Sequence, residues 1–190
     1  MHDLSLFLLE LVENSVRAGA TFVAASVVAE PSADRLTISV QDDGHGLTVT
    51  PDQALDPLYT TKSGKRAGLG LSLFRHEVEM ADGKLEIGDA AELGGVAVIA
   101  SMSLSHIDRP PLGDVVTTMQ VMAATNPEIE FRLSAAAGDT ASRVSSADLI
   151  NLTPALHACE ELLGSLPGGP HQTPSSGDTA KQLKDTRSVG

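Results

Sequence analysis

The chain has 190 residues, of which 42% are apolar, and a formal net charge of −12 at pH 7. That charge opposes binding to nucleic acid or to an anionic membrane, because phosphate groups are neutralised by clustered Lys and Arg. The single cysteine, Cys159, excludes an intramolecular disulfide, and no apolar run reaches the roughly eighteen residues of a membrane helix. We therefore expect a cytoplasmic protein with no nucleic-acid partner and no membrane partner.

The first predicted element is a helix that begins after Asp3 and ends before Gly19. Asp3 is a suitable N-cap, glycine commonly follows a helix end, and apolar residues recur at helical spacing between them. On another face Glu10, Asn14 and Arg17 fall within about 60° of one another, because positions i, i+4 and i+7 nearly superpose. Three polar groups thus converge on one place. A solvated helix face is the alternative.

Two β-prone segments follow, residues 22–29 and 36–40, and a turn separates them. They predict a hairpin that ends at Asp42. Gly44 and Gly46 come directly after it and would let a flat ring approach the backbone. A carboxylate at this point can accept a hydrogen bond from an exocyclic amine, which favours adenine over guanine. A plain Asp-Gly turn is the alternative.

After a loop of about twenty residues, a helix is predicted over 71–81, and Gly83 closes it before strands over 84–87 and 96–104. Gly68 and Gly70 precede this helix, so their amides can point at an anion that the helix dipole also favours. The loop upstream carries three cations, which favour phosphate contacts; a solvated basic loop is the alternative. The cations are Lys62, Lys65 and Arg66.

Residues 105–164 are predicted to form a second, smaller α/β unit. It is expected to contain a helix over 112–122, a strand over 129–133, a weak strand, and a helix over 154–163 with Thr153 as its cap. Residues 165–190 are rich in Gly, Pro, Ser and Thr, and we expect this tail to be disordered because it cannot offset its ordering entropy.

The polar face of the first helix suits phosphate chemistry. An amide oxygen is a suitable ligand for Mg²⁺, and Asn14 supplies one. Glu10, one turn earlier, is placed to orient or deprotonate an attacking water, and Arg17 is placed to meet a phosphate.

Three segments together resemble a known superfamily. The segment from Leu9 to Thr21 looks like the N box of the GHKL superfamily, which includes gyrase, chaperone, histidine-kinase and DNA mismatch-repair ATPases. Residues 42–46 match the G1 box, 56–62 resemble the segment that opens the histidine-kinase lid, and 67–72 match the G2 box. The resemblance implies the Bergerat ATP-binding fold in residues 1–104, an α+β two-layer sandwich with a mixed sheet and helices on one face.

Carried over position by position, the resemblance implies Glu10 as general base, Asn14 as the Mg²⁺ ligand and Asp42 as the partner of the adenine amino group. The remaining positions that it implies for ATP binding are Arg17, Gly44, Gly46, Thr61, Lys62, Gly68, Leu69 and Gly70. One departure is Val96, which stands where the family usually has a threonine that helps to hold adenine. Base binding is therefore expected to be weaker or rearranged.

The segment from Leu104 to Asp114 resembles small stand-alone ATP-binding proteins that accompany iron-only hydrogenase genes. A rigid linker at Pro110 and Pro111 is our interpretation of this segment. A metal site made by His106, Asp108 and Asp114 is the alternative.

We expect an Mg·ATP-binding protein that hydrolyses ATP slowly, or transfers its phosphoryl group, and acts on a partner protein in signalling or regulation. No helical hairpin with a phosphoacceptor histidine precedes the N box, so the acceptor is expected on another chain. The alternatives are a protein kinase of the anti-sigma type that acts in trans, and a non-catalytic module whose binding to a protein is gated by nucleotide. A homodimer is a further alternative.

Overall fold

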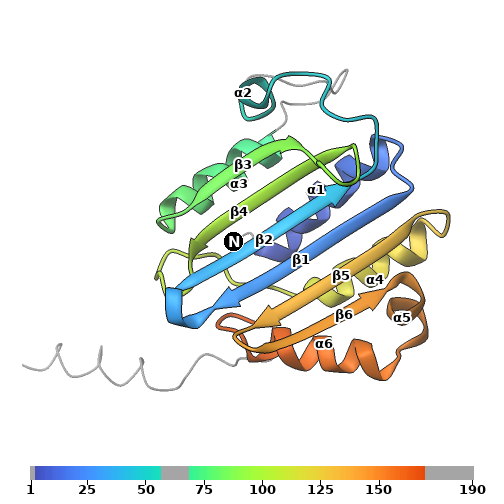
Figure 1. Cartoon of the computed structure of the whole chain (residues 1–190). Coiled ribbons are helices and arrows are strands. Elements are labelled where there is room, and N and C mark those ends of the chain that lie inside the picture. The colour runs from blue at the N-terminus through green and yellow to red at the C-terminus, as the bar shows by residue number, and fades with distance from the viewer. Residues whose placement is uncertain (1–2, 57–68, 170–190) are drawn as a thin grey trace, which may run out of the picture.

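The computed structural model describes residues 3–56 and 69–169. Within these ranges six strands form one sheet in the order β3-β4-β2-β1-β5-β6 (Figure 1). The strands are β1 (Phe22–Glu30), β2 (Arg35–Asp42), β3 (Lys84–Asp89), β4 (Val96–Ser103), β5 (Glu130–Ala137) and β6 (Thr140–Ser145). Strand β1 pairs antiparallel with β2 and parallel with β5, so the sheet is mixed.

Helices cover one face of this sheet. The helices are α1 (Leu4–Arg17), α2 (Pro51–Ala54), α3 (Leu69–Met80), α4 (Val115–Thr125), α5 (Ser146–Asn151) and α6 (Pro154–Ser165), with a 3₁₀ turn η1 at Pro31–Ala33. In Figure 1, α1, α3, α4 and α6 lie behind the sheet, and the core fills the space between the two layers. This architecture confirms the predicted α+β sandwich with helices on one face. None of the helices in the two described ranges has the length and apolar character needed to cross a bilayer.

The start and end of α1 follow the sequence prediction. The Asp3 carboxylate accepts a hydrogen bond from the backbone N–H of Leu6 at 3.0 Å, as expected of an N-cap. After the helix, Gly19 has φ = +71°, a left-handed conformation that glycine adopts without a Cβ clash. The apolar stripe of α1, including Leu4, Leu8 and Leu11, is buried against the sheet. The helix is therefore held in one rotation, which decides where its polar residues point.

Two details of the helix predictions were wrong. Helix α3 begins at Leu69 instead of residue 71, so Gly70 lies inside its first turn. Thr153 occupies the N-cap position of α6, but its hydroxyl donates to the Asp148 carboxylate at 2.9 Å and makes no capping bond. Helices α2 and α5 were not predicted, because each is shorter than two turns and has no apolar period to detect.

The elements of residues 105–164 extend the same sheet. Strand β5 pairs with β1 along Phe22–Ala29, and α4 packs beside α1. Pro111 accepts a hydrogen bond from the backbone N–H of Leu4 at 2.9 Å, and the N–H of Leu112 donates to Gly168 at 2.9 Å. The segment predicted as a linker is thus fixed between the start of α1 and the segment after α6. Residues 170–190, the predicted disordered tail, lie outside the described residues.

The Arg109 side chain joins these segments through hydrogen bonds to backbone carbonyl groups. Its guanidinium donates from Nε to the carbonyl of Leu104 at 2.8 Å, from Nη1 to that of Pro110 at 3.0 Å and from Nη2 to that of Pro167 at 2.8 Å. Burial lowers the pKa of this guanidinium, because desolvation disfavours its charged form. Arg109 therefore bonds at one point to the end of β4 and to the segment that follows α6.

Replacing Arg109 with Met is expected to lower the free energy of unfolding by about 2 to 3 kcal/mol, because the loss of a charged donor leaves three carbonyl groups without their partner. Urea unfolding followed by circular dichroism measures this change. Arg75→Met is the matched control, since Arg75 is exposed and pairs with Glu79 in a surface i,i+4 bridge. It should change stability by no more than about 0.5 kcal/mol. An equal loss of stability in the two variants would show that the carbonyl contacts of Arg109 do not stabilise the fold.

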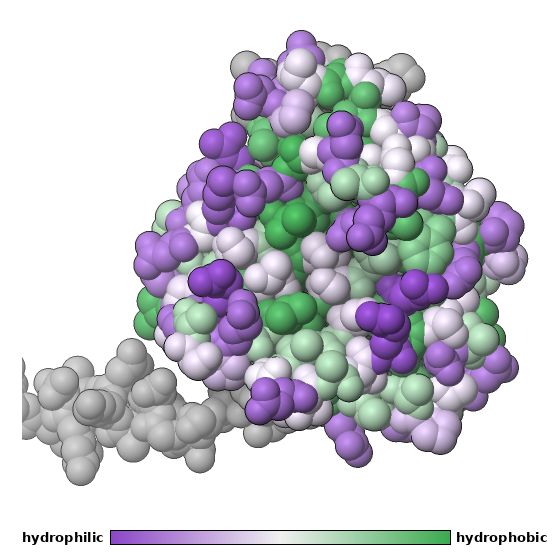
Figure 2. All heavy atoms as spheres, in the orientation of Figure 1, coloured by the Kyte–Doolittle hydropathy of each residue, from purple (hydrophilic) through white to green (hydrophobic). Residues whose placement is uncertain are grey.

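The second face of the sheet carries no helix in the part of the chain described and is turned toward the viewer in Figure 2. Hydrophilic and weakly apolar residues alternate across it without one large apolar area. Small side chains alternate with core residues along the central strands, and the hydroxyls of Ser26 and Ser39 lie 2.8 Å apart on neighbouring strands. The large buried side chains of the described residues thus lie on the helical side.

Candidate functional site

The buried carboxylate of Asp42 is the centre of the candidate site. Asp42 is the last residue of β2 and is only 4% exposed. Its Oδ1 accepts hydrogen bonds from the backbone N–H groups of Gly44 at 3.0 Å and Val96 at 3.1 Å, and its Oδ2 accepts one from the Ser15 hydroxyl at 2.6 Å. Elements β2, β4 and α1 therefore meet at one carboxylate group, whose orientation is held by three donors.

Two glycines allow this close packing. A Cβ on Gly95 would overlap both Oδ1 and the backbone carbonyl of Asp42, and it would lie 2.6 Å from the nitrogen of Gly44. A Cβ on Gly44 would lie 2.9 Å from the Cβ of Ala18, at the end of α1. Because neither glycine has a side chain, the backbone of the turn before β4 and that of the loop after β2 can both contact Asp42. Gly46 lies in the same loop with φ = +79°.

The predicted polar face of α1 is present and exposed. The Arg17 guanidinium donates from Nη2 to the Asn14 amide oxygen at 2.5 Å and approaches the Glu13 carboxylate at 3.3 Å through Nη1. Asn14 directly precedes Ser15, whose hydroxyl reaches Asp42 from the buried side of the helix. Helix α1 thus presents Asn14 to solvent and Ser15 to the carboxylate within one turn.

Glu10 connects α1 to the start of α3. Its carboxylate lies directly against the Cα of Gly70, so a Cβ there would overlap Glu10 Oε2. Gly70 is the second residue of α3, within the turn whose backbone N–H groups have no partner inside the helix. The structure therefore brings Glu10 and Gly70 together, although they lie far apart in sequence. Leu69 is the first residue of the same helix.

Thr61, Lys62 and Gly68 lie outside the described residues. Val96, the departure from the family pattern, contributes to the site through its backbone N–H, which donates to Asp42.

Sequence reasoning assigned no role to Ser15 or to Asp43. Ser15 is 3% exposed on the mainly apolar buried face of α1, and a serine at a buried helical position is the signal that could have indicated its bond to a neighbouring element. In the sequence, Asp43 is only one member of the glycine-containing turn. It accepts hydrogen bonds from the N–H and hydroxyl of Thr21, at 2.7 and 2.6 Å, and from the N–H of Phe22 at 2.8 Å.

These bonds give Asp43 a pH-dependent role. The hydroxyl of Thr21 is the main cause that lowers the pKa of the Asp43 carboxyl below its ordinary value of 3.8. The carboxylate stabilises the fold fully above about pH 4, and this contribution is lost as the pH falls through the lower folded-state pKa. Asp43 therefore fastens the start of β1 to the loop that carries the candidate site.

Asp43→Asn is expected to reduce the loss of stability in acid. Between about pH 5 and about pH 3 the unfolding free energy of the natural protein should fall more steeply than that of the variant, because only the natural residue must bind a proton. Urea midpoints at each pH measure this difference, and the other carboxylates contribute equally to both proteins. Identical slopes would mean that the Thr21 contacts do not favour the ionised form.

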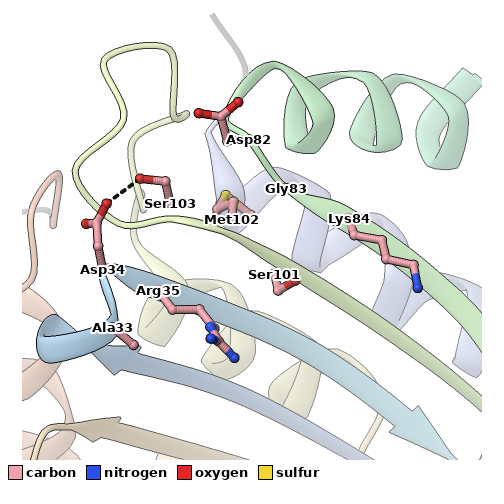
Figure 3. Close-up of a pocket in the computed structure, with 9 residues that line it drawn as sticks. All are labelled: Ala33, Asp34, Arg35, Asp82, Gly83, Lys84, Ser101, Met102 and Ser103. Atoms are coloured by element: carbon pink, nitrogen blue, oxygen red, sulfur yellow. Dashed lines mark hydrogen bonds between the residues drawn. The ribbon is translucent and has the colours of Figure 1, made fainter.

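A hollow of about 340 Å³ lies at the opposite end of the strands from Asp42 (Figure 3). It is lined by Ala33, Asp34, Arg35, Asp82, Gly83, Lys84, Ser101, Met102 and Ser103. Asp34 accepts hydrogen bonds from the hydroxyls of Ser103 at 2.6 Å and Ser105 at 3.0 Å. The Ser103 bond is the largest cause that lowers the pKa of Asp34. This carboxylate thus holds η1 to the end of β4 through hydrogen bonds. None of the predicted site residues that the structure describes borders the hollow.

The alternative metal site in residues 106–114 is wrong. Within residues 3–56 and 69–169, no group of three or more His, Cys, Asp and Glu side chains is arranged to hold a metal ion. Asp114 is instead the N-cap of α4, where its carboxylate accepts from the N–H of Thr117 at 2.9 Å and from the Thr117 hydroxyl at 2.7 Å. His106 lies nearer to Asp82, at 3.5 Å, than to Asp108, at 3.9 Å.

Comparisons with solved structures found similar chains at low identity. The "N terminal domain of a DNA repair protein" is 14% identical with TM-score 0.44 and covers 76% of this chain and 52% of its own; this chain thus spans about half of that protein's length. The "Aquifex aeolicus MutL ATPase domain complexed with ADP" is 17% identical with TM-score 0.45, and the match covers 83% of this chain and 69% of that one. "ShkA full-length in complex with AMPPNP" is 20% identical with TM-score 0.41, and the match covers 95% of this chain and 42% of that one.

No curated protein matches the chain. A family model described as "Histidine kinase-, DNA gyrase B-, and HSP90-like ATPase" matches residues 2–106. This range includes α1, both strands of the hairpin, α3, β3 and β4, and hence all the residues that surround Asp42. It is more than half of the 190 residues. The chain therefore belongs to the family of histidine kinase-, DNA gyrase B- and HSP90-like ATPases.

Proposed function

We propose that this protein binds Mg·ATP around Asp42, hydrolyses it slowly or transfers its phosphoryl group, and so regulates a partner protein. The observation that carries the proposal is the buried Asp42 carboxylate, which Ser15, Gly44 and Val96 hold in one orientation. A carboxylate offers about four acceptor positions, and the described residues use three of them. The remaining one is on Oδ2 and suits the exocyclic amine of adenine. Guanine carries a carbonyl oxygen at that position, which the carboxylate would repel.

The polar face of α1 suits the metal and the phosphates. The Asn14 amide oxygen points away from the core and already accepts from a cationic group, Arg17, so its position and chemistry fit a magnesium ligand. Phosphate and water oxygens would complete the octahedral shell of the ion, which would neutralise phosphate charge when bound. Arg17 supplies a second positive charge on the same helix, for the phosphates, and Lys62 is expected to supply another.

Glu10 is our candidate general base. It is the acidic side chain of α1 that lies against the first turn of α3, where the helix dipole favours an anion. A water that attacks a phosphate held there would lie beside its carboxylate. The glycine at position 70 leaves room for this carboxylate, because a Cβ there would require the Glu10 side chain to move away.

Calorimetric titration with a non-hydrolysable ATP analogue, with and without Mg²⁺, tests the binding proposal, and single-turnover phosphate release tests turnover. Glu10→Gln should retain binding and lower the rate of release about 100-fold or more, because a general base contributes on that scale. Glu86→Gln is the control, since Glu86 is exposed on β3 and pairs with Lys84 instead of a residue of the proposed site. Absence of magnesium-dependent binding in the natural protein would refute the proposal.

The two rival functions differ in the events after nucleotide binding. A nucleotide-gated module predicts binding without phosphate release, and partner control that Glu10→Ala leaves intact. A kinase that acts in trans predicts transfer of labelled phosphate from ATP to a co-purified protein. Neither rival has a structural observation of its own in its favour, so hydrolysis at Glu10 remains our proposal.

A further inference from the structure

Asn14 and Arg17 form an exposed cluster with Glu13 on the last turns of α1. The Nη2 of Arg17 donates to the Asn14 oxygen at 2.5 Å, and its Nη1 lies 3.3 Å from a Glu13 oxygen. One planar guanidinium can make both contacts at once, because its donors are arranged as a fixed fork. The helix dipole also favours a cation in this last turn. Arg17 is therefore held on the Asn14 oxygen by three separate interactions.

This oxygen is the same atom that the proposed function gives to Mg²⁺. A guanidinium at 2.5 Å disfavours a divalent cation on the same oxygen, because the two positive charges would repel each other at such short range. We propose that Arg17 blocks the metal-ligand oxygen of Asn14 in the nucleotide-free protein, and that the metal replaces it only when nucleotide phosphates draw the guanidinium away. This inference rests on the proposed binding of Mg·ATP and adds the order of events: the phosphates engage Arg17 before the metal reaches Asn14.

In this exchange one anionic partner of Arg17 replaces another. Without nucleotide, Arg17 compensates Glu13 and occupies Asn14. With nucleotide, the phosphates offer a bidentate partner that competes with these contacts, since guanidinium groups bind phosphate through two parallel hydrogen bonds. The freed amide oxygen then becomes available to the ion that arrives with the phosphates. A metal ion without nucleotide offers Arg17 no alternative anionic partner, so it should not displace Arg17 from Asn14.

The first test is the dissociation constant for a non-hydrolysable ATP analogue, measured by calorimetry in EDTA and in saturating Mg²⁺. The ratio of the two constants reports the coupling between metal and nucleotide. Arg17→Met should weaken metal-free binding about tenfold, through loss of the phosphate contact, and raise the coupling ratio about fivefold, through release of Asn14. Arg75→Met is the control, because Arg75 forms a similar exposed i,i+4 pair with Glu79 on α3. It should leave both quantities unchanged.

The second test needs no nucleotide. The side-chain amide signal of Asn14 is followed by NMR while Mn²⁺ is added as a paramagnetic probe. The natural protein should show no selective broadening of this signal, whereas Arg17→Met should show it. The double variant Arg17→Met with Glu13→Gln removes the carboxylate that the first substitution exposes, and it should still show the broadening if the ion binds the Asn14 oxygen.

Two results would overturn the inference. One is an equal loss of affinity with and without Mg²⁺ in Arg17→Met, or no change at all, which would make Arg17 a phosphate contact or a surface residue only. The other is broadening of Asn14 by Mn²⁺ in the natural protein, or its loss in the double variant. Failure of the natural protein to bind the ATP analogue would refute the proposed function, while the Mn²⁺ experiment would still decide whether Arg17 blocks Asn14.

Discussion

Asp42→Asn is expected to weaken ATP binding by about 100-fold or more while the protein stays folded. The fold should tolerate the amide, because its oxygen can accept from the N–H groups of Gly44 and Val96 while its NH₂ donates to the Ser15 hydroxyl, which can act as an acceptor. The same NH₂ group would then face the adenine amine, and two donors would meet. Calorimetry with a non-hydrolysable ATP analogue measures the loss.

Asp89→Asn is the control for this substitution, because Asp89 is exposed at the end of β3. Thermal unfolding of both variants separates loss of the fold from loss of recognition. An Asp42→Asn protein that binds the analogue as tightly as the natural protein would show that the base is not recognised at this carboxylate. Loss of binding accompanied by unfolding would instead make Asp42 a structural residue.

Gly95→Ala should be the most disruptive single-methyl change near the site. The added Cβ would overlap the backbone carbonyl and Oδ1 of Asp42, and it would approach the nitrogen of Gly44 to 2.6 Å. Two of these three atoms belong to backbone in paired strands or a tight loop, so they cannot move as a flexible side chain would. We expect a loss of about 3 kcal/mol in the free energy of unfolding, and loss of nucleotide binding with it.

Gly88→Ala provides the matched comparison. Gly88 lies on β3, and a Cβ there would meet no atom within 4 Å. This variant should unfold within about 0.5 kcal/mol of the natural protein and bind nucleotide normally. Urea unfolding and calorimetry measure both quantities. Similar stability of the two alanine variants would show that the turn before β4 adapts to a side chain at position 95.

The parts of the site that could be predicted are those governed by local periodicity and caps. The spacing of Glu10, Asn14 and Arg17 defines one face of a helix whatever the rest of the chain does, and Asp3 and Gly19 mark its limits. The hairpin that ends at Asp42 is indicated by alternating residues and a turn. These signals are contained in windows of fewer than about twenty residues.

The parts that could not be predicted depend on contacts between distant segments. The bond from Ser15 to Asp42 spans 27 residues, and that from the N–H of Val96 spans 54. Nothing in a local window indicates that Gly95 must lack a side chain because Asp42 lies against it. The parallel pairing of β1 with β5 is likewise a long-range choice, so the apparent second unit could not be recognised as an extension of the first sheet.

The pairing of β1 with β5 has a consequence during synthesis of the chain. Strand β1 is complete when Glu30 has been made, but its parallel neighbour begins only at Glu130. Until then one edge of a nine-residue strand rich in Val and Ala has no partner within the chain. Unpaired edges of this kind recruit strands from other molecules. A fragment that stops at residue 106, the end of the family match, would keep that edge permanently and should aggregate where the longer chain does not.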